Sequence, residues 1–192
     1  MARGRLEVVT GCMFSGKTGE LIRRLERAAI AGLSVACYKP QLDDRYSPDK
    51  AVTHYGRSFP AVALPKTISE VMEMGGDWEE SSVVAIDEGN LFDEGLVSLV
   101  LSLVERGKRV IVSGLDQDFT GAPFAPMPSL MARADSLLKL TAVCTKCGRD
   151  ATRTQRLVKG RPARPDDPLI QVGGTEAYEA RCPDHHDVPS DE

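Results

Sequence analysis

A glycine-rich segment between an apolar run and a helical repeat constrains the fold of this chain more than any other feature. The segment Gly11-Cys12-Met13-Phe14-Ser15-Gly16-Lys17-Thr18 fits the pattern G-x-x-x-x-G-K-[ST]. The β-prone run Leu6–Thr10 precedes it, and apolar residues recur at helical spacing from Thr18 to Ile30. Backbone N–H groups of such a loop and the positive end of the following helix can surround a phosphate. The sequence therefore predicts a phosphate-binding loop.

Polar groups that suit phosphoryl transfer accompany this loop. Lys17 can reach the β- and γ-phosphates of a nucleotide, and the Thr18 hydroxyl can ligate Mg²⁺. Asp87 and Glu88 follow the apolar run Val83–Ile86, which places both carboxylates at the carboxyl edge of a parallel sheet. Asp87 suits the second position that holds the same Mg²⁺ in a phosphate-loop protein, through a water molecule. Glu88 can deprotonate an attacking hydroxyl or water. This pattern alone leaves open whether the acceptor is water or an alcohol.

Strands and helices are expected to alternate as far as residue 140, and this order is typical of a parallel sheet with crossover helices. Predicted strands lie at 6–10, 33–38, 83–86, 109–113 and 136–140, and predicted helices at 18–30, 68–74 and 96–105. A long loop is expected over 40–60. We expect an ATP-binding α/β domain over 1–140 and a small zinc-binding module with an acidic tail over 141–192.

The cysteines late in the chain indicate a metal site. Cys144 and Cys147 form a C-x-x-C pair, and Cys182 and His185 repeat the spacing as C-x-x-H. Three thiolates and one imidazole are a tetrahedral zinc set, so we expect a closed structural Zn²⁺ site. His186 is an alternative fourth ligand. An odd total of five cysteines argues against a disulfide framework, and Cys12 and Cys37 are expected to be packing residues.

Charge and hydropathy exclude some classes of protein. The net charge of −4 and a pI near 5.5 argue against a protein that coats nucleic-acid phosphates, so no nucleic-acid partner is expected. No apolar stretch approaches the roughly 18–20 residues that a membrane helix needs, so no membrane partner is expected. The N-terminus lacks the apolar core of a signal peptide, and we therefore expect a cytoplasmic location.

Taken in order, the motifs resemble the small, zinc-containing thymidine kinase family of bacteria and animal cytosol. The phosphate loop with its Met-Phe-Ser core is one element of this resemblance. The others are Asp43–Tyr46 (D-x-R-[YF]), Ile86–Phe92 (D-E-x-Q-F), Gly114–Phe119 (G-L-D-x-x-F), Leu140–Cys144, and Gln171–Gly174 with Tyr178. Asn90 departs from the family, which usually has Gln at this position, and Phe92 stands one place later than the usual Phe.

The resemblance implies a RecA-like P-loop domain, a zinc domain and transfer of the ATP γ-phosphoryl group to the 5′-hydroxyl of thymidine. Glu88 is then the general base, and a homotetramer is expected. Nucleotide contacts are implied for Gly11 to Thr18, Asp43, Asp44, Arg45, Asp87, Gly89 and Asn90. The substrate contacts implied are Phe119 against the thymine ring, a lasso of Leu169, Ile170, Gln171, Val172 and Gly173, and Tyr178 beside it.

Three alternatives remain at this point. A hydrolytic P-loop ATPase with a zinc module that docks a protein or nucleic acid shares the phosphate loop and the Asp87-Glu88 pair. That alternative leaves the Phe119 turn and the segment near Gly173 unexplained. A kinase for another nucleoside would differ only in the residues that contact the base. An inactive binding protein is disfavoured because Lys17 and Glu88 are present.

Overall fold

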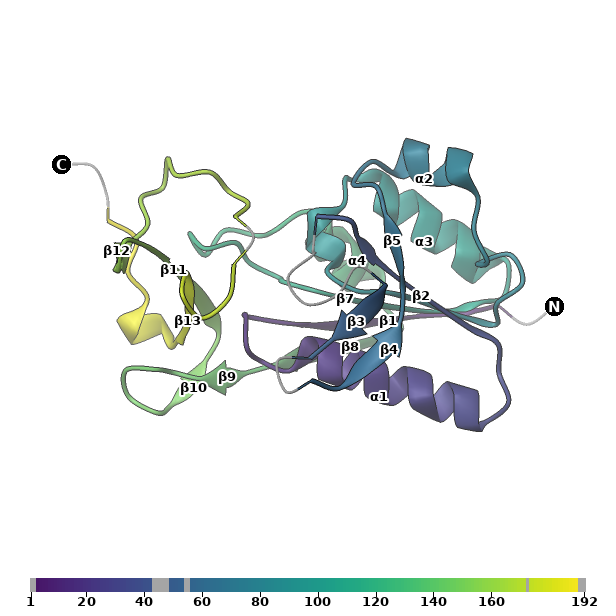
Figure 1. Ribbon diagram of the computed structural model, residues 1–192, viewed down its shortest axis with the longest axis horizontal. Helices are drawn as coiled ribbons and strands as arrows, with labels where there is room; N and C mark the ends of the chain where they lie inside the picture. Colours follow the sequence, from purple (N-terminus) through teal and green to yellow (C-terminus); the bar gives the residue numbers. More distant parts are fainter. Residues whose placement is uncertain (1–2, 43–48, 54–55, 172, 190–192) are drawn as a thin grey trace.

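The computed structural model describes residues 3–42, 49–53, 56–171 and 173–189. Within these residues, six parallel strands form one sheet in the order β5-β2-β6-β7-β1-β8 (Figure 1). Its strands are β1 (Arg5–Gly11), β2 (Val35–Pro40), β5 (Val62–Leu64), β6 (Val83–Ile86), β7 (Arg109–Gly114) and β8 (Ser136–Leu140). The expected α/β fold with a parallel sheet is confirmed, and the five predicted strands are all present.

Helices cover both faces of the sheet, and each face has its own apolar core. Helix α1 (Lys17–Ile30) lies on one side, and α2 (Ile68–Met74) and α3 (Gly95–Glu105) lie on the other (Figure 1). On the α1 side, Leu21 and Leu25 pack against Cys37, which confirms the packing role expected for this cysteine. The core on the other side includes Leu96, Val100 and Leu103 of α3. Their helical spacing is the sequence signal that predicted this helix.

Strand register sets the position of the functional loops. Thr10 of β1 pairs with Gly114 of β7, and Gly11 pairs with Leu140 of β8. Because all these strands are parallel, their carboxyl ends meet at one edge of the sheet. The phosphate loop after β1, the acidic pair after β6 and the turn after β7 are therefore neighbours.

The prediction of a long loop over 40–60 is wrong in part. Strand β3 (Lys50–Val52) pairs with β4 (Ser58–Pro60) in a hairpin, and the edge strand β5 follows. Helix α4 (Met127–Arg133) was also not predicted. Strands of three residues are too short to show a hydrophobic period in the sequence. The segment of α4 contains Pro128 and follows Pro126, and prolines are more typical of a turn than of a helix interior.

A smaller module follows the last strand of the parallel sheet (Figure 1). Its first hairpin pairs β9 (Ala142–Val143) with β10 (Asp150–Ala151). An antiparallel group in the order β12-β11-β13 follows, with β11 at Arg153–Val158, β12 at Arg161–Pro162 and β13 at Tyr178–Arg181. The short helix η2 (Pro183–His185) comes after β13. Among the described residues, no helix has the length and apolar character needed to cross a membrane.

Candidate active site

The phosphate loop is a tight backbone turn between β1 and α1. Gly11 has φ of 139°, and a Cβ atom there would lie 2.3 Å from the Leu140 carbonyl oxygen. Gly16 precedes α1 in the left-handed conformation, with φ of 88°. Both positions therefore favour glycine, as the motif suggested. The buried Lys17 side chain folds back over the loop and donates from Nζ to the Cys12 carbonyl oxygen at 2.9 Å.

The acidic pair lies beside this loop. Thr18 Oγ1 donates to Asp87 Oδ2 at 3.1 Å, and the Glu88 N–H donates to Asp87 Oδ1 at 3.1 Å. Ser113 Oγ, at the end of β7, donates to the same Oδ1. A hydroxyl and a buried carboxylate thus converge next to a phosphate loop, and oxygen ligands of this kind suit Mg²⁺. Sequence reasoning placed Thr18 and Asp87 together but missed Ser113.

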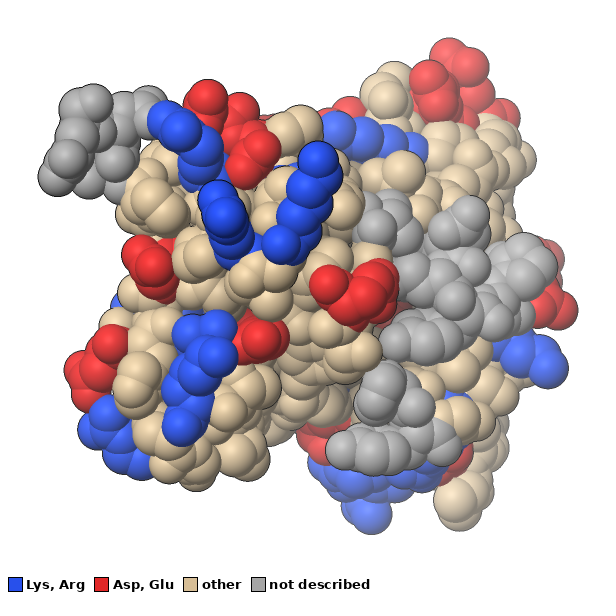
Figure 2. Space-filling view, turned by 60° about the vertical axis from the view of Figure 1, so that its left-hand side comes forward, with Lys and Arg blue, Asp and Glu red and all other residues tan. Residues whose placement is uncertain are grey.

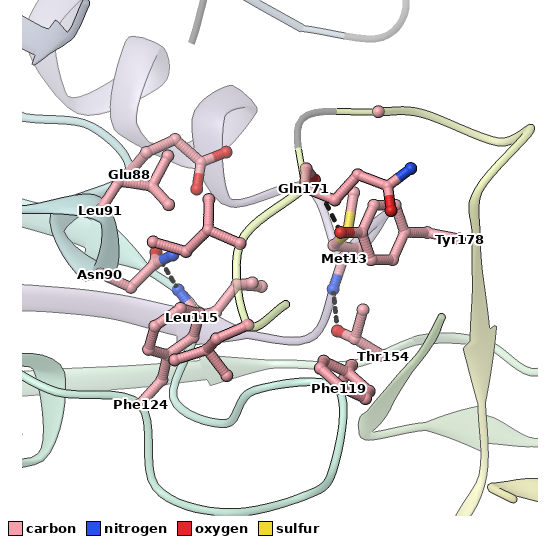
Figure 3. A pocket seen from close by; sticks show the side chains of 13 residues that line it. Met13, Glu88, Asn90, Leu91, Leu115, Phe119, Phe124, Thr154, Gln171 and Tyr178 are labelled. Atoms are coloured by element: carbon pink, nitrogen blue, oxygen red, sulfur yellow. Dashed lines mark hydrogen bonds between the residues drawn. The ribbon is translucent and has the colours of Figure 1, made fainter. Parts of the chain in front are cut away.

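A pocket of about 570 Å³ of empty space, part of it open to solvent, extends from Glu88 to residues of the small module. Figure 3 shows the Glu88 carboxylate pointing into this pocket from the sheet edge, with Gln171 and Tyr178 on the opposite side. The described residues that line it are Met13, Glu88, Asn90, Leu91, Leu115, Phe119, Phe124, Thr154, Leu169, Ile170, Gln171, Gly173 and Tyr178. One pocket therefore joins the candidate base to six of the seven residues expected to contact the nucleoside.

Two side chains form hydrogen bonds at Gln171 of the expected lasso and at Pro168, directly before it. Tyr178 Oη donates to the Gln171 carbonyl oxygen at 2.7 Å. Arg156 of β11 donates to the Pro168 carbonyl oxygen and to Gln171 Oε1. Its guanidinium carbon also lies 5.2 Å from the centre of the Phe119 ring, which is a cation–π distance. Arg156 was missed in the sequence because a charged residue in a strand is usually solvent-exposed.

The turn that carries Phe119 is fastened by neighbouring polar groups. The buried Asn90 accepts a hydrogen bond at Oδ1 from the Leu115 N–H at 2.8 Å. Asp118 Oδ1 accepts from the Thr120 N–H at 2.8 Å and closes the other end of the turn. Asn90, which departs from the family pattern, therefore supports the wall of the pocket. Gly89, the other residue next to the acidic pair, is buried at the start of the short helix η1 (Gly89–Leu91).

The expected zinc ligands form a compact group in the small module. The four ligand atoms of Cys144, Cys147, Cys182 and His185 all lie within 4.8 Å of one another. Cys147 Sγ is 3.7 Å from Cys182 Sγ, and Cys182 Sγ is 3.2 Å from His185 Nδ1. Sulfur ligands of a tetrahedral zinc ion lie roughly 3.8 Å apart. The donor set and its spacing therefore fit Zn²⁺.

His185, and not His186, faces the thiols. His186 Nε2 lies 2.9 Å from the Phe119 carbonyl oxygen and so contacts the pocket turn. Burial acts to raise the pKa of the Cys144 thiol, but backbone hydrogen bonds, from Cys182 first, lower it to about 6. In the same group, burial and hydrogen bonds with Cys147 and Cys144 raise the pKa of the Cys182 thiol, so the case for the metal site rests on the donor set and its spacing.

Four predicted site residues, Asp43, Asp44, Arg45 and Val172, lie outside the described residues. The pocket also contains residues that were not predicted to contact the nucleoside, among them Leu115, Phe124 and Thr154. These residues line the pocket because the fold brings their loops and strands together, and no local sequence motif indicates that they do so. Figure 2 shows both basic and acidic side chains on the face of the small module that comes forward.

The phosphate loop, the acidic pair and the parallel sheet define a P-loop nucleotide-binding protein of the phosphoryl-transfer class. The fold is similar to that of the flagellar accessory protein FlaH from Methanocaldococcus jannaschii. That comparison has a TM-score of 0.52 at 16% sequence identity and covers 78% of this chain and 76% of the other. At this identity the likeness concerns the fold alone.

The sequence identifies the family. Residues 4–186 match the thymidine kinase family, and the chain belongs to it. The protein is 53% identical over 188 residues to a thymidine kinase from Coprothermobacter proteolyticus, across 97% of this chain and 92% of that relative. The family resemblance derived from the motifs is thus confirmed, and a hydrolytic ATPase with a docking module is not favoured.

Proposed function

We propose that this protein is an ATP:thymidine 5′-phosphotransferase. Family membership supports the substrate and the reaction. The observation that carries the assignment of roles is one pocket that is bordered by Glu88 at one end and by Phe119, Leu169–Gln171 and Gly173 at the other. An acceptor bound there has its base near Phe119 and its hydroxyl near Glu88 and the phosphate loop.

In this proposal the ATP phosphates bind the backbone of the 11–18 loop, and Lys17 exchanges its contact with the Cys12 carbonyl for a phosphate oxygen. Thr18 and Asp87 hold Mg²⁺, which neutralises phosphate charge when bound. Glu88 accepts the proton of the 5′-hydroxyl while that oxygen forms a bond to the γ-phosphorus. The bond from the γ-phosphorus to the β–γ bridging oxygen breaks, and ADP leaves.

Recognition of the base is assigned to one aromatic ring and one backbone segment. Phe119 offers a flat apolar surface, and N–H and C=O groups of residues 169–173 can hydrogen-bond the edge of thymine. Arg156 and Tyr178 order this segment in advance, so less conformational entropy is lost when the nucleoside binds. A segment that covers the substrate also excludes water, which favours phosphorylation of the sugar over hydrolysis of ATP.

Zn²⁺ at Cys144, Cys147, Cys182 and His185 is proposed as a structural ion of the 141–192 module. These four side chains would supply all four ligands of a tetrahedral zinc ion, so no coordination position would remain open for catalysis. The proposed homotetramer rests on the family resemblance, and the proposed cytoplasmic location is the expectation from the sequence stated above. Light scattering of the purified full chain tests the assembly.

A Glu88→Gln variant tests the proposed general base. The exchange keeps the size of the side chain but removes its proton-accepting carboxylate. We expect kcat to fall by about 10²–10⁴-fold while the affinity for ATP stays close to that of the wild type. Glu94→Gln, an exposed position six residues further on, is the matched control. Retention of wild-type kcat in Glu88→Gln would exclude Glu88 as the base.

A further inference from the structure

The first half of the phosphate loop rests on the small module. Cys12 Sγ donates to the Ala151 carbonyl oxygen of β10 at 3.3 Å. The Met13 N–H donates to Thr154 Oγ1 of β11 at 3.0 Å (Figure 3). Thr154 is itself buried. Two consecutive residues of the loop are thus tied to two strands of the module that carries the zinc ligands.

Cys12 lies in an apolar cluster that also contains two of the candidate zinc ligands. Its side chain is 3% exposed. The buried members of the cluster are Cys12, Ala142, Cys144, Ala151, Ala180 and Cys182. Two of them, Cys144 and Cys182, are also zinc ligand candidates. The phosphate loop and the zinc group therefore share one small core, and a change in the packing of one reaches the other through direct contacts.

The same cysteine organises the functional side of the loop. Its carbonyl oxygen accepts from Lys17 Nζ at 2.9 Å and from Ser15 Oγ at 2.8 Å. Cys12 is therefore anchored to the zinc module through its side chain, and its carbonyl oxygen holds Lys17 beside the loop until a phosphate oxygen replaces that contact. Phosphate binding by such a loop depends on the direction of its N–H groups, so an anchored loop loses less entropy on binding ATP.

We propose that the zinc module fixes the ATP-binding conformation of the phosphate loop, with Cys12 and Thr154 as positioning residues. Zinc then supports nucleotide binding in addition to the folding of its own module. The inference rests on the proposed function because it takes the loop to be the ATP site. In the alternative, the start of α1 alone fixes the conformation of the phosphate loop, and the zinc module packs against the loop without affecting that conformation.

The test measures equilibrium binding of Mg·ATP to the zinc-loaded full chain by calorimetry. Thymidine is omitted because Thr154 also lines the nucleoside pocket. Thr154→Val keeps the shape of the side chain but removes the oxygen that accepts from Met13, and we expect about tenfold weaker ATP binding. Thr154→Ser restores the acceptor and is expected to bind within about twofold of the wild type. Thr67→Val, at the N-cap of α2 where the side chain makes no capping hydrogen bond, is the control.

A second pair of variants acts through a different atom. Cys12→Ala removes the donor to Ala151, while Cys12→Ser retains one, so ATP binding is expected to weaken more in the alanine variant. Hydrogen exchange of the wild-type chain adds a measurement that needs no variant. Removal of zinc by a chelator is expected to speed exchange of the Met13 amide before α1 loses its protection.

The outcomes separate the two proposals. If the wild-type chain does not bind ATP, the proposed function itself is wrong. If the wild type binds ATP and both Thr154→Val and Cys12→Ala bind it equally well, the loop is self-supporting and the inference is overturned. Exchange at Met13 that is unchanged by zinc removal overturns it as well. Weaker binding in Thr154→Val with recovery in Thr154→Ser supports the positioning role, because a merely misfolded module would not recover with one hydroxyl.

Discussion

Replacing Glu7 by Gln tests how a buried charge cluster holds the sheet. The Glu7 side chain is 3% exposed, accepts hydrogen bonds from Arg24 and Arg109, and forms an ion pair with Arg5. The shortest contacts are 3.0 Å to Arg5, 2.7 Å to Arg24 and 2.7 Å to Arg109, the last of which also donates from a second nitrogen at 3.1 Å. Glu7 thereby links β1, α1 and β7 at a distance from the phosphate loop.

Glu7→Gln keeps the volume but leaves three guanidinium groups without their shared carboxylate. Loss of one partner from a buried ion pair costs roughly 3–5 kcal/mol in unfolding free energy. Arg5 is 57% exposed and Arg109 is 30% exposed, so water screens part of this cost and about 2–4 kcal/mol is expected. For a chain of this size, about 3 kcal/mol lowers Tm by roughly 6–12 °C.

The loss of stability in Glu7→Gln depends on pH in a defined direction. Burial acts to raise the pKa of Glu7, but the hydrogen bond and charge of Arg109, together with Arg5 and Arg24, place it below the usual 4.5. A carboxylate with a lowered folded-state pKa stabilises the fold above its unfolded-state pKa, and this stability is lost as pH falls through the folded value. The gap in Tm between wild type and Glu7→Gln should therefore be constant near neutral pH and close below about pH 4.5.

Thermal unfolding followed by circular dichroism between about pH 3.5 and pH 7.5 measures both effects. The matched control is Glu26→Gln, which removes an exposed ion pair with Arg57 and is expected to cost less than about 1 kcal/mol. Equal Tm values for Glu7→Gln and Glu26→Gln at neutral pH would refute the argument. So would a gap that widens as the pH falls.

Two further predictions concern the site and the metal. Asn90→Ala leaves the partly buried Leu115 N–H without its acceptor, so a loss of about 1–2 kcal/mol in urea unfolding and a raised KM for thymidine are expected. An unchanged KM would show that the turn holds its place without Asn90. Cys147→Ser removes one thiolate of the metal group, so bound zinc, measured by elemental analysis, and Tm should both fall. Full zinc retention in this variant would contradict the assigned ligand set.

The parts of the site that rest on local chemistry were predictable from the sequence. The phosphate loop needs glycine at two special backbone positions, and the strand before it and the helix after it show their periods clearly. Asp87 and Glu88 follow a wholly buried strand, so the parallel sheet brings them to the same edge. The paired C-x-x-C and C-x-x-H spacings indicated which four residues gather, and the structure places them together.

Residues that act across elements were not predictable in this way. Ser113 contacts Asp87 because β7 lies beside β6, a strand order that one sequence does not reveal. Arg156 looks like an exposed strand residue, yet it is 3% exposed and holds the pocket segment. Thr154 reaches the phosphate loop only because the small module folds back on the parallel sheet. Each of these contacts depends on tertiary packing, which leaves no spacing pattern along the chain.

The most direct test of the proposed function is ATP-dependent phosphorylation of a panel of nucleosides by the purified chain, with ADP formation measured in a control that lacks nucleoside. The proposal predicts that thymidine is converted to thymidine 5′-monophosphate and that ADP forms in equal amount. It also predicts that ADP formation without nucleoside is small by comparison. Equal ADP formation with and without thymidine, and no nucleotide product from any nucleoside, would contradict it and identify a hydrolytic ATPase instead.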